Sequence, residues 1–192
     1  MADVTVWHWK DARVASVQKL AANNDRRRNL LGIWHLDTGA FTQIGRDFDE
    51  TIQIVPRTNL ALVQEWGRYA MQRSIGRSAA DLVLVDLTTG TRTPLKQNLG
   101  GNVQISPGGK YLLFVENDAW WTLNLATRAV TNISKGAATS FIDKEPDATI
   151  KQKPAFGVAG WTKQDAAVLL NDKDDLWSVA PAGPNAATPT NG

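Results

Sequence analysis

The residues that could form a serine hydrolase centre are few and stand in the wrong order. A hydrolase of the α/β type needs a serine within G-x-S-x-G, followed downstream by an acid and a histidine. The nearest string is G-R-S-A-A at residues 76–80, which lacks the closing glycine. The only histidines, His8 and His35, both precede it. The sequence therefore predicts no catalytic residues, and we expect that this chain on its own is not an enzyme.

The two histidines could instead be metal ligands. Each stands beside tryptophan on an expected strand, in W-H-W at residues 7–9 and in W-H-L at residues 34–36. If they pair across neighbouring strands, they could bind a metal, which would need a third ligand nearby, and the absence of cysteine excludes a zinc–cysteine site. No third ligand is evident in the sequence. We therefore expect two hydrogen-bonded strand histidines, no metal site and no bound cofactor.

Two groups of acidic residues could also do chemistry. The run D-K-D-D at residues 172–175 is similar to the start of a calcium loop, but Leu176 stands where that loop requires glycine. A hairpin turn that exposes acids is the expected alternative. Asp143, Glu145 and Asp147 could act as paired carboxylates, although they alternate with other residues along a lysine-containing connection. We expect a solvated connection there.

Anion-binding motifs are equally incomplete. Gly100-Gly101 and G-G-K at residues 108–110 lack the phosphate-loop spacing, and Tyr111 occupies the position of its serine or threonine. Three arginines at residues 26–28 could bind an anion or nucleic acid, or could form the solvated end of a helix. No aromatic residue is interleaved with them, and the net charge is only +2. We expect turns, a solvated helix end and no nucleic-acid partner.

Tryptophan is unusually frequent, with eight copies against two tyrosines. Stacked tryptophans could form a carbohydrate platform, or they could pack between the blades of a β-propeller. No run approaches the roughly 18 apolar residues of a membrane helix, and no signal core opens the chain. We expect no membrane partner. Because a strand pattern starts at Val4, we also expect the chain to begin inside a longer protein, periplasmic or cytoplasmic according to that parent.

Residues 102–133 define the elements that organise the chain. The pattern predicts four short strands, 103–106, 111–115, 120–125 and 129–133, joined by three tight turns. The run 111–115 is continuously apolar, as expected of a strand that is covered on both faces. Four antiparallel strands in one meander are the unit of a propeller blade, which cannot bury both faces alone.

Copies of the last hairpin of that unit recur elsewhere. They occupy residues 33–44, 85–95 and, more weakly, 176–183. Aligning Leu36, Leu87, Leu125 and Val179 gives separations of 51, 38 and 54 residues. Propeller families repeat with periods of about 40 to 50 residues. The repetition favours an array of blades.

The fold class that follows is all-β. We expect a partial or small β-propeller of about four antiparallel four-stranded blades, in one segment, with blades over residues 1–45, 51–97, 102–134 and 156–192. The first blade lacks a strand, and a short helix is inserted near residues 12–23, with Asp11 as a possible cap. Within the second blade, Trp66–Ala80 reads as a long loop. The last blade shows three strands, over 158–162, 166–170 and 175–179.

Several of these stretches resemble the propeller of bacterial serine peptidases in the prolyl oligopeptidase family. V-W-H-W-K-D at residues 6–11 is followed by an inserted helix, and I-S-P-G-G-K-Y-L-L at 105–113 is similar to the recurrent S-P-D-G-K-Y-L of that family. F-G-V-A-G-W-T-K at 156–163 and D-L-W at 175–177 resemble the same region. Two departures are Gly108, at the position of the turn aspartate, and W-G-R-Y at 66–69, where D-D-R-P-Y is expected.

This resemblance implies a role beside a catalytic domain. In that family the propeller caps an α/β-hydrolase domain and limits which peptides reach its serine. We therefore expect a non-catalytic segment that acts as an access filter and a docking surface, with the hydrolase domain and the passing peptide as partners. The alternative is a stand-alone TolB-like propeller that binds a ligand or another protein. A segment of this kind could also self-associate through open blade edges.

Overall fold

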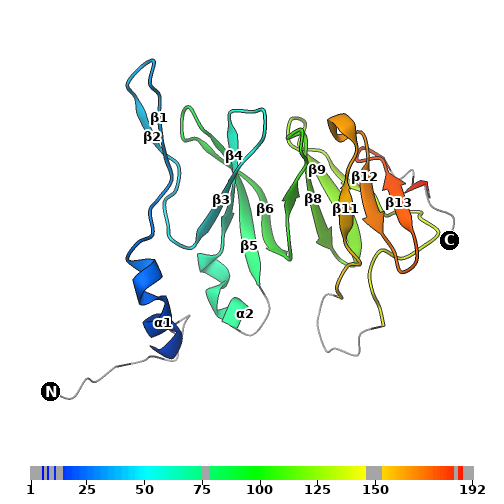
Figure 1. Cartoon of the computed structure of the whole chain (residues 1–192), viewed down its shortest axis with the longest axis horizontal. Coiled ribbons are helices and arrows are strands. Elements are labelled where there is room, and N and C mark those ends of the chain that lie inside the picture. Colours follow the sequence, from blue (N-terminus) through cyan, green and yellow to red (C-terminus); the bar gives the residue numbers. More distant parts are fainter. Residues whose placement is uncertain are drawn as a thin grey trace. The chain divides into compact units, whose positions relative to one another are not determined.

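The computed structural model describes residues 6, 8, 11, 15–74, 78–145, 153–183 and 186–187. Its strands form one two-stranded sheet and three four-stranded sheets, and every strand pair is antiparallel (Figure 1). Each four-stranded sheet keeps sequence order from edge to edge, which is the meander of a propeller blade. The fold is therefore all-β and propeller-like, with an incomplete first blade, as predicted.

The chain divides into two compact units. Unit 1 comprises Met1–Ile54 and Asn59–Gly100, and unit 2 comprises Val55–Thr58 and Gly101–Gly192. Unit 1 begins with helix α1 and the β1–β2 hairpin and continues with one blade. Its elements are α1 (Ala15–Asp25), β1 (Gly32–Trp34), β2 (Phe41–Gln43), β3 (Glu50–Ile54), β4 (Leu60–Glu65), η1 (Gly67–Tyr69), α2 (Ala70–Ser74), β5 (Ala79–Asp86) and β6 (Arg92–Gly100).

The inserted helix is confirmed, and α1 runs two residues further than expected at its C-terminal end. Most of the strand expected over Val4–Trp9 lies outside the described residues. Val6 and His8 are described, and neither belongs to a strand. Asp11 accepts a hydrogen bond from the backbone N–H of His8 at 2.8 Å. That contact shapes the turn before the helix.

The prediction of a long loop over Trp66–Ala80 was wrong in part. Residues 67–74 form η1 and α2, and β5 begins at Ala79. The turn is anchored by Tyr69, which is buried and donates from its hydroxyl to Asp81 at 2.6 Å. Because Tyr69 is surrounded by glycine and polar residues, the hydrophobicity pattern of this stretch does not reveal that Tyr69 is buried. Residues 75–77 lie outside the described part of the chain.

The core of unit 1 lies where the β1–β2 hairpin meets the β3–β6 sheet. Its buried members are Ile44, Ala61, Val63, Val83, Val85 and Leu87. Ile33 of β1 and Ile52 of β3 pack against this cluster. Because alternate residues of a strand point to opposite faces, Ala61 and Val63 bring one face of β4 to the hairpin. The two-stranded β1–β2 sheet therefore packs face to face against the β3–β6 sheet.

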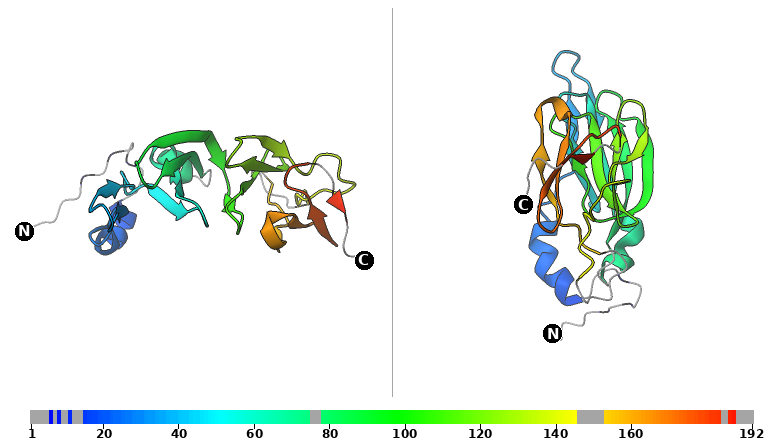
Figure 2. Two further views of the ribbon diagram at one scale, coloured as in Figure 1. Left: turned by 90° about the horizontal axis from the view of Figure 1, so that it is seen from above. Right: turned by 90° about the vertical axis from the view of Figure 1, so that its right-hand side faces the viewer.

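Unit 2 contains two complete blades, which lie side by side in Figure 2. The first confirms the predicted meander, and the second has a fourth, two-residue strand in the proline-containing tail where only three strands were expected. The elements are β7 (Gln104–Ile105), β8 (Tyr111–Glu116), β9 (Ala119–Asn124), β10 (Val130–Asn132), β11 (Val158–Trp161), η2 (Lys163–Asp165), β12 (Val168–Asn171), β13 (Leu176–Val179) and β14 (Ala186–Ala187).

An apolar cluster joins the two blades of unit 2. It contains Leu113, Trp120, Ile133, Phe141, Val168, Leu170 and Val179. Phe141 comes from the connection 134–154, whose charges indicated a solvated segment. Phe141 and Ile142 are each only 2% exposed, and a β-bridge joins Ile142 to Ala155. The connection therefore carries a buried anchor, and its residues 146–152 lie outside the description.

The repeated hairpin has one loop geometry in three copies. In each copy, the backbone N–H of the first loop residue donates to the carbonyl oxygen of the residue five positions later. The carbonyl oxygen of the same first residue accepts from the backbone N–H of the residue four positions later. The pairs are His35–Ala40 with Gly39–His35, Asp86–Thr91 with Gly90–Asp86, and Asn124–Ala129 with Arg128–Asn124. The fifth residue has positive φ each time, 72° at Gly39 and Gly90 and 64° at Arg128. The sequence repeat is thus a structural repeat.

Candidate functional site

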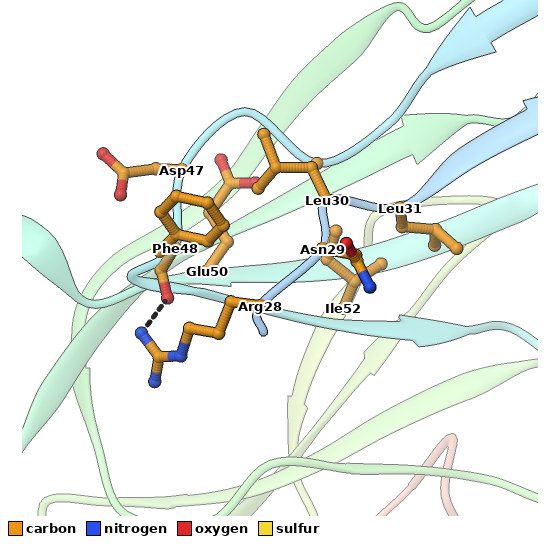
Figure 3. Close-up of a pocket in the computed structure, with 9 residues that line it drawn as sticks. Arg28, Asn29, Leu30, Leu31, Asp47, Phe48, Glu50 and Ile52 are labelled. Carbon is orange, nitrogen blue, oxygen red and sulfur yellow. Dashed lines mark hydrogen bonds between the residues drawn. The ribbon is translucent and has the colours of Figure 1, made fainter. Parts of the chain in front are cut away.

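Unit 1 contains a pocket of about 320 Å³. Three segments form it: the approach to β1, the loop after β2, and the start of β3 (Figure 3). Its lining consists of Arg28, Asn29, Leu30, Leu31, Gly45, Asp47, Phe48, Glu50 and Ile52. A volume of roughly 300 Å³ is at the small end of the range for ligand pockets.

Backbone hydrogen bonds hold the first two segments together. The N–H groups of Ile44 and Gly45 both donate to the carbonyl of Leu31, at 2.9 and 2.8 Å. The Arg28 guanidinium donates through Nη1 to the carbonyl of Phe48 at 3.2 Å, the dashed contact in Figure 3. A β-carbon on Gly45 would lie 3.0 Å from the backbone nitrogen of Leu31, so a small residue fits this crossing best.

A buried ion network underlies the pocket. Arg92 donates through Nη2 to Glu50 Oε1 at 2.6 Å and to Glu65 Oε1 at 2.9 Å, and through Nη1 to the carbonyl of Ile44 at 3.0 Å. Glu50 Oε2 accepts from the backbone N–H of Arg46 at 2.8 Å. Both oxygens of Glu50 are therefore engaged, and the side chain is only 6% exposed. This carboxylate positions the pocket wall and is not a free base.

The pocket lining is suited to binding and not to nucleophilic chemistry. It combines one guanidinium, two carboxylates and an amide with four apolar side chains. The residues that line it include no serine, histidine, lysine or tyrosine. Such a surface can hold a peptide-like group through hydrogen bonds and a small apolar contact.

The serine and histidines considered above stay apart from the pocket lining. Ser78 is exposed and directly precedes β5, while Gly76 and Arg77 lie outside the described residues. The ring of His35 lies with Nε2 at 3.3 Å from Thr42 Oγ1, across the β1–β2 hairpin. Within the described part of the chain, no group of three or more histidine, cysteine or acidic residues could hold a metal ion.

The acids of residues 172–175 form a turn. Asp172 Oδ1 accepts from the N–H groups of Asp174 and Asp175 at 2.9 and 2.6 Å. Its Oδ2 accepts from Trp177 Nε1 at 2.7 Å. Burial raises the pKa of Asp172, but these hydrogen bonds outweigh it and hold the pKa below 3.8. Asp172 therefore organises the β12–β13 hairpin.

The two described acids of the acidic connection, Asp143 and Glu145, make contacts other than a carboxylate pair. Glu145 forms a 2.5 Å ion pair with Lys173, and both side chains are largely exposed. Asp143 accepts from the backbone N–H of Glu145 at 3.0 Å. Asp147 lies outside the described residues. Of the three arginines, Arg28 contacts Asp25 at 3.3 Å and closes the pocket, and all three are exposed at the end of α1.

The tryptophans mostly pack or form hydrogen bonds inside the blades. Trp161 stacks on Tyr111 with ring centroids 6.2 Å apart, and Trp177 meets Phe141 edge to face at 6.0 Å. Trp120 is 5% exposed, and its indole nitrogen has no acceptor among the described residues. Only Trp34 presents a largely exposed ring among the tryptophans that the structure describes, so the packing interpretation fits the others better than a carbohydrate platform.

The glycine turn at residues 107–110 forms hydrogen bonds with Asp165, a residue that the sequence did not indicate as important. Asp165, 3% exposed, accepts from Ser106 Oγ at 2.7 Å and from the N–H groups of Gly108 and Lys110 at 2.8 and 3.3 Å. Asp165 follows W-T-K-Q in a stretch whose sequence is typical of a turn. Nothing in the neighbouring sequence indicates which distant turn the Asp165 carboxylate contacts. The G-G-K string is thus a docking point for a carboxylate of the next blade and not a phosphate loop.

No protein-family model matches the chain, and no curated protein matches it. Solved structures that match include TolB from Acinetobacter baumannii, with 19% sequence identity and a TM-score of 0.45. The match covers 84% of this chain and 37% of that chain, so this chain spans little more than a third of the TolB chain. The sheets themselves define the class, a propeller-like repeat protein. No helix in the described ranges is long and apolar enough to span a membrane.

Proposed function

We propose that this chain is a non-catalytic β-propeller segment that provides a docking surface for another protein domain. The observation that carries this proposal is the use of its reactive side chains. His35 contacts Thr42, Glu50 holds Arg92, and Asp165 holds the 106–110 turn, so each of these groups is committed to the fold. What the segment offers to a partner is a small mixed pocket and exposed sheet surface.

The partner that we propose is an α/β-hydrolase domain of a serine peptidase, with the segment limiting which peptides enter. The support is the resemblance of residues 6–11, 105–113 and 156–163 to that family's propeller. The pocket suits contact with a peptide-like chain, because Arg28 and Asp47 offer charge beside the apolar Phe48 and Leu30. A stand-alone TolB-like binding module is the competing proposal.

A serine-directed probe tests the non-catalytic part. The chain should not react with a fluorophosphonate reporter and should not release chromophore from proline-containing peptide anilides. Labelling that disappears in Ser78→Ala would overturn the proposal, because it would identify an activated serine. A matched control is Ser140→Ala, since Ser140 is also exposed and its hydroxyl donates to the carbonyl of Ile142.

The reading frame of the gene tests the partner. A frame that encodes a G-x-S-x-G element several hundred codons downstream would supply the proposed domain. That domain, produced separately, should then bind this chain in calorimetry, and Phe48→Asp should weaken the binding. A frame without such an element would reject the peptidase parent and favour the stand-alone module.

A further inference from the structure

One edge of β1 is open where the equivalent strands of the other blades are paired. Among the described strands, β1 pairs only with β2, whereas β5, β9 and β13 each pair with a neighbour on both sides. Alternate residues of an antiparallel strand direct their N–H and C=O groups to the same side. The N–H of His35 donates to the carbonyl of Ala40, and that of Ile44 donates to the carbonyl of Leu31, so residues 31, 33 and 35 face β2. The N–H and C=O groups of Gly32 therefore point to the open edge.

The β3–β6 sheet shows which element occupies this edge in a complete blade. There β4 pairs with β5, and the short helices η1 and α2 stand between them in the chain. Counting back from the shared hairpin loop, Val83 of β5 is the equivalent of Gly32, and its partner on β4 is Val63. The order of a helix followed by a hairpin recurs in α1, β1 and β2. The equivalent of β4 is therefore expected in the sequence before α1.

A turn before each helix aligns the two segments. Directly after β4, the N–H of Tyr69 donates to the carbonyl of Trp66 at 2.9 Å. Before α1, the N–H of Asp11 donates to the carbonyl of His8, also at 2.9 Å. Matching these two turns aligns residues 62–65, the end of β4, with V-T-V-W at residues 4–7. Branched and aromatic residues of this kind favour a strand.

The alignment also predicts a register that pairs apolar residues. Transferring the β4–β5 partners to the first blade places Val4 opposite Ile33 and Val6 opposite Leu31. Ile33 packs against the core of unit 1, so both pairs would lie on the core side of the hairpin. Val6 is 89% exposed and Leu31 is 38% exposed in the structure, so each has apolar surface that this pairing would cover.

The length of the chain before α1 permits this pairing. Helix α1 and the start of β1 lie at the same end of the hairpin, away from the loop at residues 36–39 (Figure 1). An antiparallel neighbour of β1 must end at that same end. The seven residues 8–14 can span up to about 23 Å when extended. This exceeds the length of the 11-residue helix α1, which is about 16 Å.

We propose that residues 4–7 of this chain dock on the open edge of β1 as a third antiparallel strand. In this arrangement Thr5 lies opposite Gly32, and the two residues exchange backbone hydrogen bonds. Leu31, beside this pair, also lines the pocket, so the docked strand extends the pocket wall. The proposal goes beyond the proposed function and does not depend on a hydrolase partner.

A disulfide tests the register. The chain has no cysteine, so Val6→Cys combined with Leu31→Cys allows a single bridge. Directly opposite residues of an antiparallel pair have β-carbons about 4.5 to 5.5 Å apart, close enough for a disulfide to form. Mild oxidation should give an intrachain disulfide, detected by mass as a monomer about 2 Da lighter. The matched control, Val6→Cys with Leu36→Cys, should stay reduced, although Leu36 is 81% exposed, because it lies in the loop at the far end.

Amide hydrogen exchange, followed by NMR, tests the pairing itself. Exchange of the Gly32 N–H should be at least about tenfold slower in the wild type than in Thr5→Pro, which removes the opposing donor. Thr5→Val keeps that donor and should keep the protection. Equal exchange in the wild type and Thr5→Pro, or equal oxidation of the two cysteine pairs, would overturn the proposal. Protection that appears only at high protein concentration would also overturn it, because a second copy would then occupy the edge.

Discussion

The hydroxyl of Ser106 donates to the carboxylate of Asp165 across 2.7 Å, although the residues are 59 positions apart. Two further donors, the N–H groups of Gly108 and Lys110, converge on the same carboxylate. The Lys110 ammonium adds a bond to the carbonyl of Gln164 at 2.9 Å. This contact joins the β7–β8 turn to the η2 turn of the next blade and does so in a buried site.

Asp165→Ala should destabilise the protein by about 2 to 4 kcal/mol, because it leaves the buried Ser106 hydroxyl and the Gly108 N–H without their acceptor. The loss is measured as the free energy of unfolding in urea, followed by tryptophan fluorescence. Asp174→Ala is the control, since Asp174 lies in an exposed turn of the same unit. Equal losses for the two variants would contradict the role assigned to Asp165.

Gly108→Asp should also destabilise the protein, although it restores the acid of the S-P-D-G-K pattern. A β-carbon at residue 108 would lie 2.5 Å from Asp165 Oδ2, and the new carboxylate would repel the existing one. The expected loss is about 2 kcal/mol or more. Adding Asp165→Ala should cost less in this background than in the wild type, which a double-mutant cycle measures. Additive losses would show that the two positions do not interact.

Arg92→Met should cost about 3 to 5 kcal/mol of unfolding free energy, because Glu50 is left buried without its cation. Arg68→Met provides the comparison, since Arg68 pairs with Asp81 at 3.3 Å but is 67% exposed. Its loss should stay near 0 to 1 kcal/mol. The double change Arg92→Met with Glu50→Met should recover part of the loss, and the measurement is urea unfolding of all variants.

Tyr69→Phe should lower stability more at neutral pH than in acid. Burial raises the pKa of Asp81, but the hydrogen bonds from Tyr69 and the Asn98 N–H, with the charge of Arg68, hold it below 3.8. A carboxyl whose pKa is lowered in the folded state stabilises it above the unfolded pKa, and this stabilisation is lost as pH falls through the folded value. The difference between wild type and variant should therefore shrink in that acid range.

The control for this pH dependence is Asp81→Asn. In that background residue 81 no longer titrates, so the effect of Tyr69→Phe should be constant from pH 7 down to about pH 3. The hydrogen bond to Asp81 also raises the pKa of Tyr69 above 10.0. The stabilisation that this hydrogen bond provides is therefore present below pH 10.0 and is lost as the pH rises through the raised pKa of Tyr69. If the effect of Tyr69→Phe still shrinks in acid in the Asp81→Asn background, the assignment of this pH dependence to Asp81 is wrong.

Much of the fold was predictable, because a strand meander leaves a local signal. The alternation at residues 120–125 and the repeat around Leu36, Leu87 and Leu125 identified hairpins that the structure contains. The turn residues indicated where the hairpin loops lie, since Gly39 and Gly90 adopt the positive φ that these loops require. These features depend on residues close together in sequence.

What could not be predicted depends on distant contacts. Tyr69 stabilises η1 through Asp81, and Phe141 enters a cluster formed by two blades. Asp165 finds its donors 55 to 59 residues away. The exposure of Trp34 and Phe41 on the β1–β2 hairpin was not predicted, because the local pattern of residues 33–44 is that of an ordinary buried hairpin.

The shared loop geometry has a consequence for engineering. Arg128 adopts at 64° the left-handed conformation that Gly39 and Gly90 adopt freely, and a side chain there costs about 1 kcal/mol. Since the three loops have the same internal hydrogen bonds, we expect that one loop can replace another. A loop of this length grafted from one hairpin to another would leave the flanking strands in register.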